Sequence, residues 1–256
     1  EFSFETPMHF ISMKQFFTVD NPLLWWPRGL GEPDLYTVTT ELLKDGEVVD
    51  SKVERFGIRK AEIEAVYDQG LENKFNIRIN GRKLLALGSN WVPLDAFHSR
   101  DAERLETALA MMNDLSCNII RCWGGNVYED HRFYDICDES GILVWQDFAF
   151  ACGVYPHNDE FYTMVREEVD SVVKKLRNHP CILLWAGDNE IDQAYQGMRY
   201  NELEHTRHNV INREIIPAGC RDHDPYRYYI PSSPYFPEDM DIQKEYPFTP
   251  EQHNWG

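Results

Sequence analysis

The sequence NIIRCWGGNVYEDHRFYDICDESGILVWQDF, residues 118–148, contains two apolar segments on either side of an amphipathic one. NIIRCW and ILVWQDF are short and largely apolar, which is typical of parallel strands that are buried on both faces. DHRFYDICDESG predicts a helix that ends at Gly141, because glycine readily adopts the left-handed conformation after the last turn of a helix. A strand, a helix and a second strand in this order indicate a parallel sheet with helices packed outside it.

The alternation of strands and helices continues on both sides of this unit. Before it, FNIRINGRKLLALGSNW predicts a hairpin that leads into a buried strand from Leu84 to Gly88, and DAERLETALAMMNDLS predicts a helix. After it, DEFYTMVREEVDSVVKKLRNH predicts a helix, CILLWAG a strand, residues 199–216 a helix and YRYYIPSS a strand. About five strands therefore follow residue 80, and the predicted fold class is α/β.

Polar and aromatic residues cluster just after the predicted strands. No GxGxxG or GxxxxGKS/T motif follows any strand, which disfavours a nucleotide-binding doubly wound fold. The clusters are Asn90-Trp91, Trp123-Gly124-Gly125, Gln146-Asp147, Asn189-Glu190 and Ser232-Ser233. Because barrels and open parallel sheets both carry their sites at the carboxyl ends of strands, we expect a functional site to be built from these clusters.

Residues 1–65 have a different pattern, which predicts β structure. LYTVTTELL and VVDSKVERFGIRKAEIE are strand-like, and Asp45-Gly46 between them suits a tight hairpin turn. The hairpin is of the kind found in β-sandwiches, but it supplies too few strands for a complete one. We therefore expect the earlier part of this domain to precede residue 1.

Composition and charge exclude several classes of function. The 256 residues carry a formal net charge of −18, which disfavours binding to nucleic acid or to an anionic membrane surface. No apolar run is long enough to span a bilayer, and no signal peptide is visible. The six cysteines lack CxxC spacing, so we expect buried free thiols and neither a zinc site nor another metal site.

Glu190 is the strongest candidate for a catalytic residue. It follows the apolar strand CILLWAG, where partial desolvation would raise the pKa of a carboxyl toward that of a general acid. The neighbouring Asp188 would act in the same direction if its charge were close. The alternative is a glutamate that stabilises a helix N-terminus. Asn189 could bind a sugar hydroxyl through its carboxamide, or it could cap that helix.

Arg121 and Trp123 both belong to the predicted strand NIIRCW, with Trp123 as its last residue. A buried arginine needs a carboxylate partner, which can be structural or catalytic. Trp123 could be a platform for a sugar ring or a core residue. His179 in RNHP is interpreted as a hydrogen-bonded loop residue. No GxSxG or HExxH motif is present, so serine-triad and metalloprotease chemistry lack support.

The motifs together resemble a known family. LRNHPCILLWAGDNE resembles the acid/base signature of glycoside hydrolase family 2. NPLLWWPRGLGEPDLYTV, LLALGSNWVPLDAF and NIIRCWGGNVYEDHRFYDICDESGILVWQDFAFACGVYP are similar to segments of the β-mannosidase branch of that family. They occur in the order of the family and cover nearly the whole chain. Asp188 and Asn126 stand where the family usually has Asn and Gly.

The resemblance implies an architecture. Residues 1–68 would be the C-terminal part of an immunoglobulin-like β-sandwich domain. Residues 69–256 would be the N-terminal part of a catalytic (β/α)8 TIM barrel, about strands one to five, reaching toward strand six at HNWG. The expected fold is thus α/β, a partial (β/α)8 TIM barrel preceded by part of a sandwich. The family's jelly roll would precede residue 1.

The resemblance also implies roles for residues. Glu190 would be the catalytic acid/base and Asn189 the ligand of the sugar 2-hydroxyl, while Arg121 would contact the nucleophile. Trp123 and Trp91 would lie near the subsite for the non-reducing sugar, and Asn90 is assigned to substrate binding with them. The nucleophile, a glutamate on barrel strand seven, is expected beyond residue 256, so the chain alone would be inactive unless Asp95 or Asp147 replaced it.

The implied activity is that of a retaining exo-glycoside hydrolase that removes terminal β-D-mannose from oligosaccharides. Another exo-acting activity of the family, of the β-glucosaminidase or β-galactosidase type, and a non-catalytic sugar-binding remnant are the alternatives. The expected partner is a glycoside or oligosaccharide substrate, without a cofactor, metal, nucleic acid or membrane. A periplasmic, secreted, lysosomal or cytoplasmic location and any oligomeric state are compatible with the sequence.

Overall fold

A five-stranded parallel sheet forms the centre of the molecule, in the order β10-β9-β8-β7-β6. This computed structural model describes residues 3, 5–7, 16, 18–67, 74–197, 208–237 and 249–253. The strands of the sheet are β6 (Gly88–Trp91), β7 (Ile119–Cys122), β8 (Leu143–Asp147), β9 (Ile182–Ala186) and β10 (Tyr228–Ile230). Each strand pairs in parallel with the next strand of the sheet along the chain. Their carboxyl ends therefore meet at one edge, as in part of a (β/α)8 barrel.

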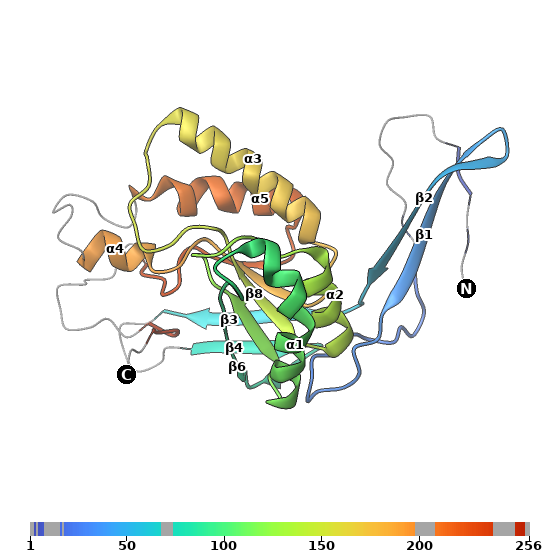
Figure 1. The fold of residues 1–256 in the computed structure, drawn as a ribbon, viewed down its shortest axis with the longest axis horizontal. Coiled ribbons are helices and arrows are strands. Elements are labelled where there is room, and N and C mark those ends of the chain that lie inside the picture. The colour runs from blue at the N-terminus through green and yellow to red at the C-terminus, as the bar shows by residue number, and fades with distance from the viewer. Residues whose placement is uncertain are drawn as a thin grey trace.

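Helices connect and cover these strands (Figure 1). The regular helices are α1 (Asp101–Asp114), α2 (His131–Ser140), α3 (Asp159–Leu176), α4 (Ile191–Gly197) and α5 (Ile216–His223). The first three confirm the sequence predictions. Asn158 accepts a hydrogen bond from the N–H of Phe161 at the start of α3, and Gly141 ends α2 in the left-handed conformation with φ of 67°.

The helix predicted for residues 199–216 differs from the observed one. Its first part, to residue 207, lies outside the described residues. A π-helical turn, Ile211–Ile215, leads directly into α5, so the helix continues to His223. Pro217 does not stop it and stands where the π-helical turn passes into the regular α-helix.

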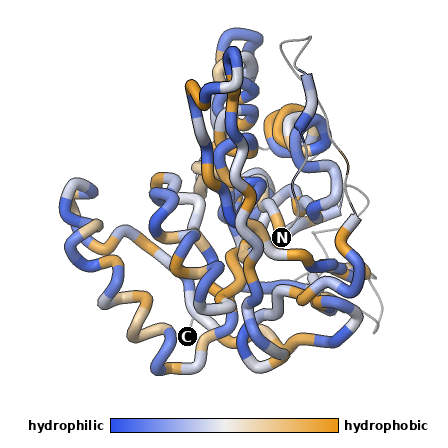
Figure 2. The backbone as a smooth tube through the Cα atoms, turned by 90° about the vertical axis from the view of Figure 1, so that its right-hand side faces the viewer, coloured by the Kyte–Doolittle hydropathy of each residue, from blue (hydrophilic) through white to orange (hydrophobic). Residues whose placement is uncertain are grey.

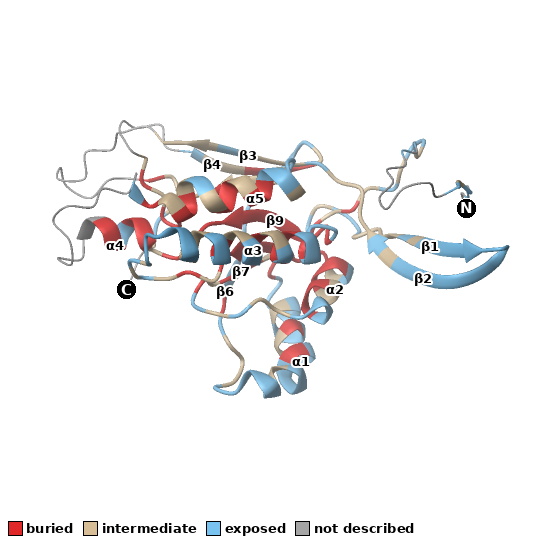
Figure 3. Cartoon of the chain, turned by 90° about the horizontal axis from the view of Figure 1, so that it is seen from above, coloured by how far each residue is buried: buried red, intermediate tan, exposed pale blue. Residues whose placement is uncertain are grey.

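Burial follows position in the sheet. Every residue of β8 and β9 is buried, because these strands have neighbours on both edges and cover on both faces (Figure 3). The predicted buried strand from Leu84 to Gly88 is wrong. The strand begins only at Gly88, and Leu85 and Leu87 before it are 75% and 54% exposed. Among the described residues β6 is an edge strand, so hydrophobicity alone does not bury this segment.

The N-terminal region is a hairpin followed by a meander. The hairpin of β1 (Tyr36–Lys44) and β2 (Glu47–Phe56) projects from the rest of the molecule (Figure 1). Asp45 and Gly46 at its turn have φ of 54° and 84°, the left-handed pair that suits a two-residue hairpin turn. In Figure 2, where this side of the molecule faces the viewer, hydrophobic and hydrophilic residues are interspersed along the chain.

The long return strand predicted after the hairpin is two strands. β2 ends at Phe56, and β3 (Ala61–Val66) then pairs with β4 (Lys74–Ile79), which pairs with β5 (Arg82–Leu84). The ring of Phe75 in β4 stacks on Trp145 of β8 with centroids 5.6 Å apart, so the meander packs against the parallel sheet. The domain boundary near residue 68 stays a prediction, and it falls between two strands that pair with each other.

Buried polar contacts fix the N-terminal segment to the barrel. Trp25 is fully buried, and its indole N–H donates to the carbonyl of Asp138 at 2.9 Å. The Arg59 guanidinium donates to the carbonyls of Pro180 and Ile182, at the start of β9. Within the described ranges, no helix has both the length and the apolarity to cross a bilayer. All six cysteines are free thiols as expected, but Cys152 is exposed.

Candidate active site

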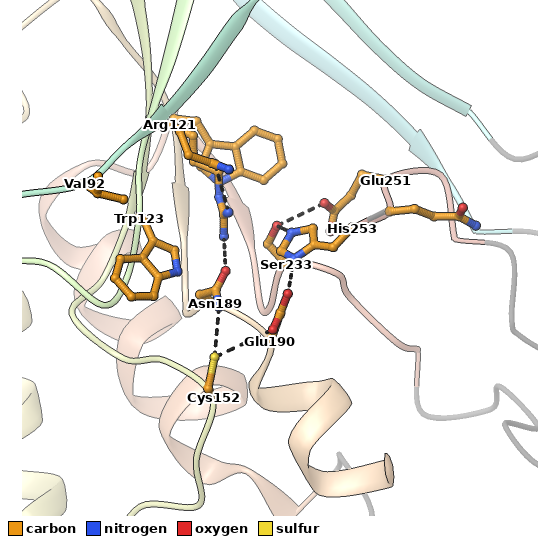
Figure 4. A pocket seen from close by; sticks show the side chains of 12 residues that line it. Val92, Arg121, Trp123, Cys152, Asn189, Glu190, Ser233, Glu251 and His253 are labelled. Atoms are coloured by element: carbon orange, nitrogen blue, oxygen red, sulfur yellow. Dashed lines mark hydrogen bonds and ion pairs between the residues drawn. The ribbon is translucent and has the colours of Figure 1, made fainter. Parts of the chain in front are cut away.

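A cavity of about 600 Å³ opens at the carboxyl ends of the parallel strands (Figure 4). Each strand of the sheet supplies the cavity with a residue, either from its last positions or from the loop that follows it. The lining residues are Asn90, Val92, Arg121, Trp123, Trp145, Cys152, Asn189, Glu190, Ser233, Glu251, Gln252 and His253. The cavity therefore brings together Glu190, Asn189, Arg121, Trp123 and Asn90 from the sequence-predicted site.

Arg121 organises the floor of the cavity. Its guanidinium donates twice to Asp147, with the shorter contact at 2.7 Å, and also to the side-chain oxygens of Asn90 and Asn189 at 3.3 and 3.0 Å. The predicted carboxylate partner of Arg121 within the described residues is thus Asp147. Two neighbouring amide side chains are oriented by the same cation, which leaves their NH2 groups for other acceptors.

Asp147 is buried beneath Arg121 and does not line the cavity. Its carboxylate also accepts from the backbone N–H of Gly124 at 3.0 Å and from the indole N–H of Trp145 at 2.9 Å. Burial raises the pKa of Asp147 to about 6, and the Arg121 cation opposes this rise. A carboxylate with this many donors is poorly suited to attack a substrate. Asp95, the other alternative nucleophile, is paired with Arg104 and is not among the lining residues.

The backbone at Glu190 is held on both sides by the segments that follow strands β8 and β10. The N–H of Asn189 donates to the carbonyl of Phe150, and the N–H of Glu190 donates to the carbonyl of Ser233, both at 2.9 Å. Glu190 itself has φ of 60°, a left-handed conformation that residues with a side chain rarely adopt. Such conformations persist where the surrounding structure enforces them, often at functional sites.

The capping role considered for Asn189 belongs to another residue, whereas Glu190 does stand directly before helix α4, and its carbonyl accepts from the N–H of Ala194 at 2.9 Å. Asp188 accepts from the N–H of Ile191 at 3.1 Å and so caps helix α4. Asn189 instead contacts Arg121 and donates to the sulfur of Cys152 at 3.2 Å. The side chain of Glu190 extends into the cavity, where its two oxygens contact His253 and Cys152 (Figure 4).

Asp188 points away from the cavity, into a buried polar network. Its carboxyl accepts from Ser232 at 2.5 Å and from Asn212 at 2.6 Å. Burial, together with the charge of the nearby Asp192, raises the pKa of Asp188 to about 8. The raised pKa disfavours a full negative charge on Asp188 beside Glu190. Asp192 is paired with Arg213 at 2.7 Å.

The two tryptophans of the predicted site lie in different places. Trp123 lines the cavity, and the space beside its ring depends on Gly125, where an added Cβ would lie 2.1 Å from the ring. Trp91 is buried and is not a lining residue; its indole N–H donates to Glu129 at 2.9 Å and its ring packs on Phe133. Trp91 follows Asn90 directly, and successive side chains of a strand point to opposite faces.

Sequence reasoning missed part of the site. His253 contacts Glu190 at 2.6 Å, and Glu251 accepts a hydrogen bond from Ser233 at 3.0 Å. Neither follows one of the five predicted strands. Cys152 was grouped with the buried thiols. Ser233 did lie in one of the polar clusters after a strand, and that position was the available signal.

Comparisons with known proteins agree with this geometry. Residues 3–59 match the model described as glycosyl hydrolases family 2, and residues 71–216 match its TIM barrel domain. Beta-mannosidase B of Aspergillus fumigatus is 37% identical over 234 residues, which cover 87% of this chain and 28% of that protein. The goat (Capra hircus) beta-mannosidase is 37% identical over 241 residues, covering 87% of this chain and 27% of that protein.

Solved structures give the same result. The crystal structure of the β-D-mannosidase from Dictyoglomus thermophilum matches with a TM-score of 0.81 and 42% identity, over 87% of this chain and 28% of that one. A β-glucuronidase from Parabacteroides merdae, with a TM-score of 0.66 and 24% identity over 82% of this chain and 25% of that one, shares the fold. The chain thus spans less than a third of the length of these relatives.

Proposed function

Because this chain belongs to glycoside hydrolase family 2, we propose that the protein containing it is a retaining exo-glycosidase that removes terminal β-linked mannose from oligosaccharides. The fold is a partial (β/α)8 TIM barrel preceded by part of an immunoglobulin-like sandwich, as expected. The observation that supports the proposal best is the convergence of Glu190, Asn189, Arg121 and Trp123 on one cavity at the strand ends. The named β-mannosidases among the relatives support the choice of sugar.

In the proposed mechanism Glu190 acts first as an acid. Its carboxyl donates a proton to the glycosidic oxygen while a second carboxylate attacks the anomeric carbon, so the aglycone leaves and a glycosyl-enzyme forms. Glu190, now ionised, then removes a proton from water, and the resulting hydroxide releases the sugar with retained configuration. Glu190 is suited to both steps because its side chain extends into the cavity and is only partly exposed, at 17%.

The second carboxylate is proposed to lie beyond residue 256. Retaining enzymes hold the two carboxyl groups about 5 Å apart. Of the described lining residues, Glu190 and Glu251 carry carboxyl groups. Glu251 accepts from Ser233, and its other oxygen is shielded from solvent, so it is not presented for attack on a sugar.

Three residues are proposed to hold the sugar. Trp123 offers an aromatic face at the cavity wall, which suits the apolar C–H face of a pyranose. The carboxamide of Asn189 is oriented by Arg121, so its position is fixed before substrate arrives. Such preorganisation lowers the entropic cost of reaching the reactive geometry. The carboxamide is proposed to bind the sugar hydroxyl next to the anomeric carbon, where hydrogen bonds strengthen in the transition state.

The test uses the full-length protein with a panel of nitrophenyl glycosides and alkyl mannosides. We expect β-mannosides to be hydrolysed faster than every other glycoside of the panel. Glu190→Gln should slow alkyl mannosides far more than dinitrophenyl mannosides, since a good leaving group needs little protonation. Azide should partly restore turnover by attacking the glycosyl-enzyme. Glu167→Gln, an exposed site on α3, is the matched control. Equal losses on both substrates without rescue by azide contradict the role of Glu190.

A further inference from the structure

A continuous chain of hydrogen bonds links Glu190 to Glu251. Glu190 Oε1 lies 2.6 Å from His253 Nδ1, and His253 Nε2 lies 3.1 Å from Ser233 Oγ. Ser233 Oγ in turn lies 3.0 Å from Glu251 Oε2. All of these residues line the proposed active-site cavity, and Figure 4 shows the contacts of Glu190 with His253 and of Ser233 with Glu251. Two carboxyl groups are thus joined through one imidazole and one hydroxyl.

The directions of these hydrogen bonds depend on each other. Ser233 has a single hydroxyl proton, and a neutral histidine has a single N–H. Burial lowers the pKa of His253, which favours the neutral ring. If Ser233 donates to an ionised Glu251, its oxygen must accept from His253 Nε2–H. His253 Nδ1 then has no proton, so the 2.6 Å contact requires Glu190 to be protonated and to donate.

The opposite arrangement is equally complete. If Glu251 is protonated it donates to Ser233, Ser233 donates to His253 Nε2, and Nδ1–H donates to an ionised Glu190. The two arrangements contain the same number of protons and differ by one proton passed along each link. With a neutral His253, ionising both carboxyl groups forces one of the contacts to join two acceptors, and the hydrogen-bond chain is broken. A protonated His253 between two ionised carboxyl groups would complete the chain, but burial disfavours the charged ring.

We propose that Glu251 is a positioning residue that shares one proton with Glu190 through Ser233 and His253. This inference rests on the proposed acid/base role of Glu190. The shared proton is lost only when both carboxyl groups ionise, which the chain disfavours. The direction of the Ser233 hydroxyl therefore determines whether Glu190 or Glu251 holds the shared proton.

The surroundings of Glu251 agree with this role. Burial raises the pKa of Glu251 to about 7, so a carboxyl that holds a proton near neutral pH lies at the far end of the chain. One of its oxygens is shielded from solvent and has no hydrogen-bond partner among the described residues, which further disfavours its ionised form.

Other titratable and charged groups face the chain. The Arg121 cation lowers the pKa of both Glu251 and His253, and the buried Asp147 raises that of Glu251. The phenols of Tyr67 and Tyr228 lie near Glu251, and a backbone hydrogen bond from Tyr235 lowers the pKa of Glu251. The thiol of Cys152 contacts Glu190, and the carboxyl of Asp188 lies near that thiol. None of them bridges the two ends of the chain in the described residues, so the coupling runs through His253 and Ser233.

Two substitutions in the full-length protein test the coupling. In Glu251→Gln the end of the chain is uncharged, so Ser233 can turn toward His253 at little cost. In Ser233→Ala the chain of hydrogen bonds between His253 and Glu251 is interrupted. Each variant lets His253 donate to an ionised Glu190, so each should move the alkaline limb of the kcat/KM profile down by about one pH unit. Because both act through one path, the double variant should shift it no further. Glu214→Gln, an exposed site, is the control.

A second readout does not depend on turnover. Nitrogen NMR of labelled histidine distinguishes the two neutral tautomers of His253. We expect both variants to increase the Nδ1–H form relative to the unsubstituted protein at neutral pH. If the protein hydrolyses no glycoside but the tautomer still responds, the proposed function fails while the coupling stands. An unchanged tautomer, or alkaline limbs that move independently and additively in the two variants, overturns the coupling.

Discussion

The thiol of Cys152 lies 3.7 Å from Glu190 Oε2, while the other oxygen of the same carboxyl contacts His253. Cys152 also accepts from the side chain of Asn189 and is the one exposed cysteine of the chain. A methanethiosulfonate reagent should therefore react at Cys152 and block hydrolysis, because the added group fills the space beside Glu190. Substrate should protect the enzyme, and Cys152→Ser should make it resistant. Inactivation of the serine variant at the same rate would contradict this assignment.

The Arg121–Asp147 pair should dominate the stability of the cavity floor. Arg121→Met leaves a buried carboxylate without its cation and should lower the free energy of unfolding by about 3–5 kcal/mol at neutral pH. The folded-state pKa of Asp147 is raised to about 6. The contribution of Asp147 to stability therefore falls as the pH rises from the ordinary pKa of an aspartate through that raised pKa. The defect should thus shrink in acid. Urea unfolding of the variant and the unsubstituted protein at neutral and at acidic pH measures this defect, with exposed Arg221→Met as control.

Asp188→Asn should make the protein more stable in alkaline solution. The folded-state pKa of Asp188 is raised to about 8, so the folded protein holds a proton that the unfolded chain has already lost. Stability from this group is therefore fully present only below the ordinary pKa of an aspartate, declines as pH rises through neutrality to about 8, and changes no further above that pH. Asparagine cannot ionise, and it should gain on the order of 2 kcal/mol over aspartate in alkali. Unfolding curves that keep the same pH dependence in both proteins would refute this.

Gly125→Ala should weaken substrate binding without unfolding the barrel. An added Cβ would lie 2.1 Å from the ring of Trp123, and the ring, which lines the cavity, is the part that can move. Displacing a stacking platform should raise KM about tenfold and change kcat little. Trp123→Ala should have the same kinetic effect and serves as the comparison. A fall in kcat alone would mean that the loop positions Glu190 rather than the sugar.

The 256 residues expressed alone should be inactive and should bind hydrophobic dyes. Leu85 and Leu87 are largely exposed beside edge strand β6, and the β1–β2 hairpin exposes Val53 at 63%. Unpaired strand edges and exposed apolar residues promote association. Leu87→Ser should reduce dye binding, whereas a change at exposed Glu167 should not. A monomer that melts cooperatively and hydrolyses mannosides would show that the nucleophile lies within this chain.

Much of the fold could be predicted from the sequence because buried parallel strands are short apolar runs. β8 and β9 correspond to such runs, and helix α3 between them begins at the capping residue Asn158. The same signal failed at Leu85 and Leu87, since apolar character does not say whether another element covers a residue. Glu190 and Asn189 could be predicted as site residues because they closely follow one of these apolar runs.

The rest of the site depends on long-range contacts that local patterns do not encode. Glu190 and His253 are 63 residues apart in the chain, and their contact follows only from the assembled sheet. Asn90 and Trp91 are adjacent, yet one faces the cavity and the other the core, because the pleat of β6 separates them. A one-residue change in register would have exchanged their roles.

The left-handed backbone at Glu190 implies a conflict between activity and thermal endurance. A side chain in this conformation costs about 1 kcal/mol or more, a cost that glycine does not incur. Glycine at this position should therefore yield an inert protein that melts at a higher temperature than the natural one, while alanine should not. Selection for thermal stability alone would favour glycine at this position, whereas selection for catalysis retains the glutamate.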